Sequence, residues 1–119
     1  MTDSGNTGRN GELLVAEFLR RNGYTVVKRN YRSRFGEIDI IAENSEYIIF
    51  TEVKTRSANS LFTPAEAVNA AKRRRILLTA EDFLAKYETS LQPRFDVAEV
   101  IVSGGGGDRY KLNYIKNAF

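Results

Sequence analysis

Two aliphatic segments separated by a short polar turn constrain the fold of this chain more than any other feature. The first reads GEIDIIA over residues 36–42, and the second reads YIIFTEVKT over residues 47–55. Both are rich in β-branched residues, and the intervening ENSE is short and polar. These features predict two strands joined as an antiparallel hairpin.

The flanking segments predict an α/β sandwich around this hairpin. Before the hairpin we expect a helix over 11–22, a strand over 24–31 and a basic loop over 32–36. After it we expect a helix from Pro64 to about Tyr87, a strand over 94–102, and a last strand or short terminal element over 109–119. Ala67 and Ala71 would allow close approach near the start of the second helix. The long helix permits a crossover, so the strand at 94–102 can pair in parallel with the second hairpin strand. We expect a mixed sheet in one domain over residues 8–119, after a disordered N-terminus at residues 1–7.

The chain of 119 residues contains neither cysteine nor histidine. These absences exclude disulfides, thiolate nucleophiles, zinc sites built on soft ligands and any mechanism with an imidazole base. Hydrolysis by this chain would have to use carboxylates, lysine, hydroxyl groups or a metal ion. A metal ion held by oxygen ligands would be magnesium, manganese or calcium.

No apolar stretch approaches the length of about 18 residues that a membrane span requires. The N-terminal MTDSGNTGRN has neither the basic start nor the apolar segment of a secretory signal. We therefore expect a cytoplasmic protein without membrane insertion. The net charge of +3 is weak support for a nucleic-acid partner on its own.

Ionisable residues lie within the aliphatic hairpin strands, where an unpaired charge is costly. Strand side chains alternate between the two faces of a sheet, so every second residue lies on the same face. The residues that share one face are Glu37, Asp39 and Ile41 on the first strand, and Phe50, Glu52, Lys54 and Arg56 on the second. Pairing of Ala42 with Tyr47 would place Asp39 opposite Phe50 and diagonal to Glu52. Pairing of Glu43 with Ile48 would place Asp39 directly opposite Glu52. Both registers bring the two carboxylates within reach of one small cation.

A hard metal ion, Mg²⁺ or Mn²⁺, accounts for two adjacent carboxylates that would otherwise repel each other. Glu37 could join or replace Asp39 as a ligand, and Asp39 is preferred because its neighbours are aliphatic. Lys54 could then orient water or offset charge on a phosphate, and Arg56 could contact the phosphate with its planar fork. The alternative is a salt-bridge ladder in which Asp39 pairs with Lys54 or Arg56 on an open sheet face.

The sequence also resembles a known family. GELLVAEFLRRNGYTVVKRNYR, GEIDIIA, FTEVKTR, AVNAAKRRRI and RFDVAEV together look like the bacterial YraN family, from about Gly8 to the C-terminus. EID followed by EVK resembles the PD-(D/E)xK phosphodiesterase superfamily, and the arrangement is more distantly similar to archaeal Holliday-junction resolvases. Ile38 stands where the superfamily signature has proline.

The resemblance implies a restriction-endonuclease-like three-layer sandwich with a helix-strand-strand-strand-helix-strand core. It implies that Asp39 and Glu52 are metal ligands and that Lys54 is the catalytic lysine. Glu12 matches a first-helix glutamate that reaches the site directly or through water. Its alternative is an exposed glutamate favoured by the helix dipole.

Basic residues outside the hairpin are candidate nucleic-acid contacts. Lys72 matches a position where superfamily members often place a lysine or glutamine near the site, whereas the run from Lys72 to Arg75 is otherwise typical of a solvated helix surface. Arg32 and Arg34 belong to a basic and aromatic loop that could track a phosphate backbone. The alternative for this loop is a charged connector.

These observations lead to the expectation of a metal-dependent nuclease acting on DNA rather than RNA, including structured or branched DNA. One rival is a nucleic-acid-binding module without catalysis that acts in repair, recombination or uptake. Another is a structural protein whose acidic cluster is only a salt-bridge network. A homodimer is also an expectation, because a small nuclease often uses two subunits to cut two strands.

Overall fold

The computed structural model describes residues 4–57, 69–103 and 109–119, with side chains from residue 10 onward. The elements are α1 (Ser4–Arg21), β1 (Thr25–Ser33), β2 (Gly36–Glu43), β3 (Tyr47–Ser57), α2 (Ala70–Lys86), β4 (Gln92–Ser103) and β5 (Arg109–Ile115). The order of helix, three strands, helix and two strands confirms the predicted α/β fold. In the part of the chain that the structure describes, no helix has both the length and the apolar character needed to cross a membrane.

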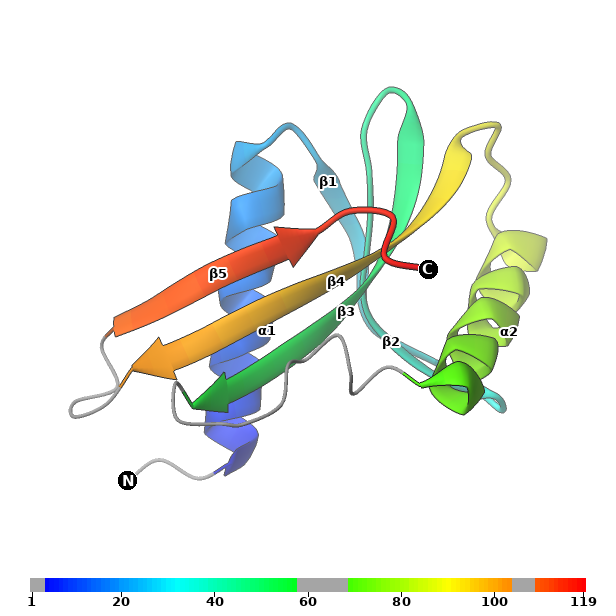
Figure 1. The fold of residues 1–119 in the computed structure, drawn as a ribbon. Coiled ribbons are helices and arrows are strands. Elements are labelled where there is room, and N and C mark those ends of the chain that lie inside the picture. Colours follow the sequence, from blue (N-terminus) through cyan, green and yellow to red (C-terminus); the bar gives the residue numbers. More distant parts are fainter. Residues whose placement is uncertain (1–3, 58–68, 104–108) are drawn as a thin grey trace.

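The strands form one mixed sheet in the order β1-β2-β3-β4-β5 (Figure 1). Neighbouring strands are antiparallel except β3 and β4, which pair in parallel from Tyr47–Gln92 to Ser57–Val102. The connection between β3 and β4 includes α2, as a parallel pair requires. The parallel pairing predicted for these two strands is therefore confirmed.

The helices cover opposite faces of the sheet, which we call the α1 face and the α2 face. In Figure 1, α1 runs behind the strands and α2 lies at the right beside β2. The core on the α1 face contains Val15, Ala16, Leu19, Ile40, Ala42, Ile49, Ala98 and Val100. The core on the α2 face contains Ile38, Ile41, Ile48, Phe50, Ile76, Ala80, Phe83 and Val97. Burial of these side chains is the main force that holds the three layers together.

Helix α1 begins at Ser4, earlier than the predicted start at Gly11. Residues 4–10 have no apolar periodicity, so the sequence pattern did not reveal this part of the helix. The helix ends at Arg21, one residue before the predicted end at Asn22, and is followed by Gly23, whose φ of 88° lies in the left-handed region. The Tyr24 N–H donates to the carbonyl of Leu19 at 3.0 Å, which closes the last turn as in a Schellman motif.

Helix α2 begins at Ala70, after Asn69, which is extended with φ −79° and ψ 176°. The Asn69 side chain caps the helix by accepting a hydrogen bond from the Lys72 N–H at 2.9 Å. An uninterrupted helix from Pro64 is therefore wrong, although Pro64 and Ala67 themselves lie outside the described residues. Ala71 is exposed, so it does not provide the close approach that was expected of it.

Strand β2 departs from strict alternation near Asp39. Ile38 and Ile41 are three residues apart, yet both pack in the core of the α2 face. The neighbouring strand is irregular at the same level, since Asn30 has a φ of 54° and lies between the pairs Arg29–Ile40 and Tyr31–Ile38. Asparagine tolerates this left-handed conformation better than most residues. The regular sheet is thus interrupted where the candidate site lies.

Candidate functional site

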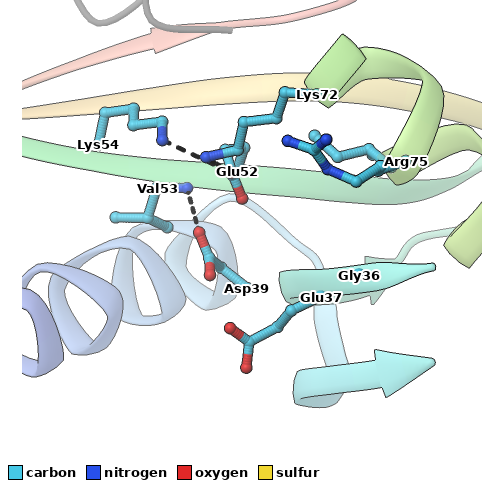
Figure 2. Close-up of a pocket in the computed structure, with 9 residues that line it drawn as sticks. Gly36, Glu37, Asp39, Glu52, Val53, Lys54, Lys72 and Arg75 are labelled. Carbon is cyan, nitrogen blue, oxygen red and sulfur yellow. Dashed lines mark hydrogen bonds and ion pairs between the residues drawn. The ribbon is translucent and has the colours of Figure 1, made fainter. Parts of the chain in front are cut away.

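A cavity of about 280 Å³ lies between β2, β3 and the first turns of α2. Its lining residues are Gly36, Glu37, Asp39, Glu52, Val53, Lys54, Lys72, Arg75 and Ile76. Figure 2 shows that β2 contributes Asp39, β3 contributes Glu52 and Lys54, and α2 contributes Lys72 and Arg75. Residues from three elements therefore meet in one cavity, including the predicted Asp39, Glu52, Lys54 and Lys72.

The register between β2 and β3 places Asp39 and Glu52 at the same level. Glu43 pairs with Ile48, which is the second of the two registers considered from the sequence. Regular pairing runs as far as Ile40 and Thr51, and the next residues in this register are Asp39 and Glu52. Beyond that point, the Val53 N–H donates a 2.7 Å hydrogen bond to the Asp39 carboxylate instead. The Asp39 side chain therefore takes the place of a main-chain acceptor where the strands diverge.

Burial, together with the smaller effects of the nearby negative charge and hydrogen bond of Glu52, raises the pKa of Asp39 to about 8. The Val53 N–H opposes these effects by stabilising the ionised form. Glu12 adds a smaller Coulombic contribution that also raises the pKa of Asp39. In the metal-free protein, Asp39 therefore holds a proton near neutral pH.

Two lysines converge on a single carboxylate oxygen of Glu52. Nζ of Lys72 lies 2.6 Å from Oε2, and Nζ of Lys54 lies 3.6 Å from the same atom. The Glu52 side chain is only 7% exposed, and the lysines are partly buried. Figure 2 shows both lysines reaching toward Glu52, Lys54 along the sheet and Lys72 from α2.

The pKa values of the two lysines shift in opposite directions in this arrangement. Burial lowers the pKa of Lys54, and Lys72 lowers it further. For Lys72, burial also favours the neutral amine, but its hydrogen bonds and the negative charges of Glu52 and Asp39 outweigh burial, so the pKa of Lys72 is raised. Of the two lysines, Lys72 is therefore the one whose charged form Glu52 stabilises more strongly.

The donor atoms in the cavity fit a hard divalent cation. Asp39 and Glu52 supply carboxylate oxygens, and Val53, which lines the same cavity, has a main-chain carbonyl. Among the residues that the structure describes, no three acidic side chains lie close enough together to bind one metal ion. A metal ion here would complete its coordination with water or substrate oxygens, as Mg²⁺ commonly does.

Glu12 lies apart from the lining residues of the cavity. It extends from α1 and forms an ion pair with Arg29 of β1, with 3.4 Å between Oε1 and Nη2. The Glu12 side chain is 18% exposed, so it is not the exposed glutamate that the helix-dipole alternative describes. Gly11, the residue before it, lies so close to β3 that a Cβ atom at this position would clash with Oγ1 of Thr55. This close approach packs the middle of α1 against β3 at Thr55 and Val53.

Residues 32–35, which we call the β1–β2 connection, lie outside the cavity; the predicted loop over 32–36 is shorter in the structure, because β1 extends to Ser33 and β2 begins at Gly36. Arg32 is exposed and pairs at 2.9 Å with Glu37. Figure 2 shows the Glu37 carboxylate pointing away from Asp39, although Glu37 lines the cavity. Arg34 is exposed, and its guanidinium lies 4.9 Å from the centre of the Phe35 ring. The connection places two arginines at the surface near the cavity wall formed by Gly36.

Arg56 and Arg75 differ from their predicted positions. Arg56 is half-buried on β3 and is not among the residues that line the cavity. Arg75 lines it, although the sequence singled out only Lys72 from the basic run. Helical spacing could have identified Arg75, because residues three apart project from the same side of a helix.

The family model and the similar proteins found by comparison all point to the same family. Residues 11–100 match the "Uncharacterised protein family UPF0102". The chain is 43% identical over 113 residues to a UPF0102 protein of Alkaliphilus metalliredigens, covering 94% of this chain and 96% of the relative. It is 45% identical to a UPF0102 protein of Symbiobacterium thermophilum, covering 94% of each. It is 37% identical to a UPF0102 protein of Nitrosomonas europaea over 100% of this chain and 98% of the relative. The predicted YraN-like resemblance is confirmed, and the chain belongs to the UPF0102 family.

Proposed function

We propose that this protein is a metal-dependent nuclease that hydrolyses phosphodiester bonds in DNA, including structured or branched DNA. The observation that carries the proposal is the meeting of Asp39, Glu52, Lys54 and Lys72 in one cavity. Two carboxylates beside several cationic side chains suit a site that holds both a metal ion and a phosphate.

Asp39 and Glu52, with the carbonyl of Val53, would hold Mg²⁺ or Mn²⁺. When bound, the metal ion would polarise the phosphate and lower the pKa of water. The main-chain N–H of Val53 fixes the orientation of Asp39 through its 2.7 Å hydrogen bond. The ladder between β3 and β4 fixes the backbone at Glu52, which pairs with Val97. The sheet thus holds both carboxylates in a preorganised position.

Lys54 would orient the attacking water or stabilise the negative charge that develops on the phosphate. Its lowered pKa, caused chiefly by burial, makes proton transfer easier than for an exposed lysine. Lys72 and Arg75 would contact phosphate oxygens from the opposite wall, which α2 forms. Arginine is well suited to this contact because its planar fork donates two parallel hydrogen bonds.

A nucleic-acid substrate is proposed because exposed arginines lie near the cavity on the β1–β2 connection and on α2, and the choice of DNA follows from the PD-(D/E)xK resemblance. These are Arg32, Arg34 and Arg75. The connection is tied to the helix, since the Ser33 hydroxyl lies 3.0 Å from the Thr79 hydroxyl. Such a surface would contact the phosphate backbone without reading the bases. The PD-(D/E)xK resemblance of EID and EVK gives independent support, as does the observed order of helices and strands.

A cleavage assay with single-stranded, duplex and branched DNA, in Mg²⁺, Mn²⁺ or EDTA, tests the proposal. Wild-type protein should cleave at least one substrate only with divalent metal, and Glu52→Gln should reduce the rate by about 100-fold or more. Glu99→Gln is the matched control. Glu99 is buried on β4 outside the cavity and accepts a hydrogen bond from Asn113 that glutamine can still accept.

Absence of cleavage on every substrate, or cleavage unaffected by Glu52→Gln, would reject the nuclease. The exposed arginines favour one second candidate, a nucleic-acid-binding module without catalysis. That candidate predicts salt-sensitive DNA binding that persists in EDTA and in Glu52→Gln.

A further inference from the structure

Lys72 contacts Oε2, one of the two carboxylate oxygens of Glu52 that a metal ion could bind. Its Nζ is 2.6 Å from Oε2 of Glu52, a short, charge-assisted contact. Lys54 lies 3.6 Å from this same oxygen. Asp39 instead accepts the Val53 N–H, so the two carboxylates of the cavity have different partners. The ammonium groups are therefore concentrated on Glu52.

A divalent cation bound to Oε2 would lie beside the Lys72 ammonium, which is 2.6 Å from the same oxygen. Metal–oxygen bonds to Mg²⁺ are about 2.0–2.1 Å long, so the two cations would be brought into close contact on one oxygen. The repulsion is strong because Glu52 is buried and screening by water is weak. This repulsion favours release of the ammonium when a metal ion binds to Oε2.

On the basis of the proposed function, we propose that Lys72 is the resident counter-ion of Glu52 in the metal-free protein and competes with the divalent cation for this carboxylate. Binding of the metal ion releases the Lys72 ammonium, which then becomes a ligand for a substrate phosphate oxygen. Lys72 is thus a specificity-determining group of the site, because it discriminates against cations that bind too weakly to displace it.

Geometry explains why Lys72 moves. Its backbone is fixed by the Asn69 cap, which accepts the Lys72 N–H at 2.9 Å, whereas its side chain has a flexible four-carbon stem. The ammonium can leave Glu52 by side-chain rotation alone. Arg75, three residues later on α2, lines the same cavity. The released ammonium and this guanidinium would face one volume and could bind a phosphate together.

Calorimetric titration of Mn²⁺ into the full chain at one pH tests the competition. Lys72→Met should bind Mn²⁺ about tenfold more tightly than wild type, because a competing cation is removed. Lys72→Arg should bind no more tightly than wild type, because it retains the competing charge. Lys86→Met is the matched control on the same helix, since Lys86 is exposed and pairs with Asp82. Its Mn²⁺ affinity should stay within about twofold of wild type.

Cleavage provides a second readout, since Lys72→Met should cleave DNA more slowly at saturating Mn²⁺ even though it binds the metal ion more tightly. Unchanged or weaker Mn²⁺ binding by Lys72→Met would overturn the competition while leaving the nuclease proposal intact. Absence of Mn²⁺ binding by wild type and all variants would overturn both. Thermal unfolding of each metal-free variant checks that the fold is retained.

Discussion

Asp39 and Glu52 lie in one cavity, but their surroundings give them different charges in the metal-free protein. Glu52 is neutralised by ammonium groups, at 2.6 Å from Lys72 and 3.6 Å from Lys54. Asp39 has a main-chain donor, and burial and Glu52 raise its pKa to about 8. A metal ion that binds both carboxylates must therefore displace a proton from one and an ammonium from the other.

The raised pKa of Asp39 predicts a pH-dependent stability. The carboxyl binds its proton up to about pH 8 in the folded protein, compared with an ordinary pKa of 3.8. Because the folded state binds more protons between these values, the free energy of unfolding should fall as pH rises from about 4 to about 8. Asp39→Asn removes this dependence. Urea unfolding in EDTA should show the variant gaining at least about 1 kcal/mol relative to wild type between pH 5 and pH 8. Parallel pH profiles for the two proteins would contradict the assignment.

A second buried carboxylate, that of Asp96, belongs to an ion pair that lies within the core. Asp96 is fully buried on the α1 face and pairs with Arg94 at 2.8 Å. It also accepts hydrogen bonds from the Tyr114 hydroxyl and the Asn117 N–H. The network is well satisfied, which is the condition under which a buried ion pair is tolerated.

Removal of one partner from this network should be costly. Asp96→Ala leaves the Arg94 guanidinium buried without its carboxylate and should lower the free energy of unfolding by about 3–5 kcal/mol. Tyr114→Phe removes only a hydroxyl and should cost about 1–2 kcal/mol. Urea unfolding at pH 7 measures both changes, and a loss below about 1 kcal/mol for Asp96→Ala would contradict the structural role.

Among the elements, the hairpin of β2 and β3 was predictable because its aliphatic segments and polar turn are local signals. Its register was not, since both alternatives bury similar aliphatic side chains. The turn explains the choice. Oδ1 of Asn44 accepts the N–H groups of Glu46 and Tyr47, and the Asn44 N–H donates to the Tyr47 carbonyl. These contacts close the turn at a pair that continues the observed register.

The convergence of α2 on the carboxylates could be only partly predicted. Lys72 was identified by resemblance. The start of α2, however, depends on the capping hydrogen bond of Asn69, which a pattern of apolar residues does not predict. The irregularity near Asp39 was also unpredictable, because it depends on the left-handed backbone of Asn30 in a neighbouring strand. Such tertiary effects override simple alternation.

The Asn69 cap gives a prediction for α2. Asn69→Ala removes the acceptor of the Lys72 N–H and should lower the free energy of unfolding by about 1 kcal/mol. Asn69→Asp preserves an acceptor and should remain within about 0.5 kcal/mol of wild type. Urea unfolding of the three proteins distinguishes these effects. Equal stability of Asn69→Ala and wild type would show that the cap does not stabilise α2.

In the whole molecule, the sheet separates the cavity, which α2 helps to line, from most of the α1 face. The exposed arginines of the β1–β2 connection and of α2 lie near the cavity, whereas Arg21 lies at the end of α1 and pairs with Glu17. The net charge is only +3, so the distribution of these groups would determine where a polyanion binds.

This distribution predicts a local dependence of DNA binding on charge. Arg34→Gln and Arg75→Gln should each weaken binding and reduce the slope of log affinity against log salt by about one. Arg21→Gln should leave the slope unchanged. Fluorescence anisotropy of labelled DNA in EDTA, over a range of salt concentrations, measures the slopes. An equal effect of all three substitutions would indicate non-specific attraction to the whole protein.

Single-turnover cleavage of DNA tests most directly whether the cavity is a metal-dependent nuclease site. Wild type, Asp39→Asn and Glu99→Gln should be compared at saturating Mn²⁺ on the best substrate of the panel. We predict that Asp39→Asn cleaves at least about 100-fold more slowly than wild type and that Glu99→Gln stays within about threefold of it. Equal cleavage rates for Asp39→Asn and wild type would contradict the assignment of this cavity as the site of hydrolysis.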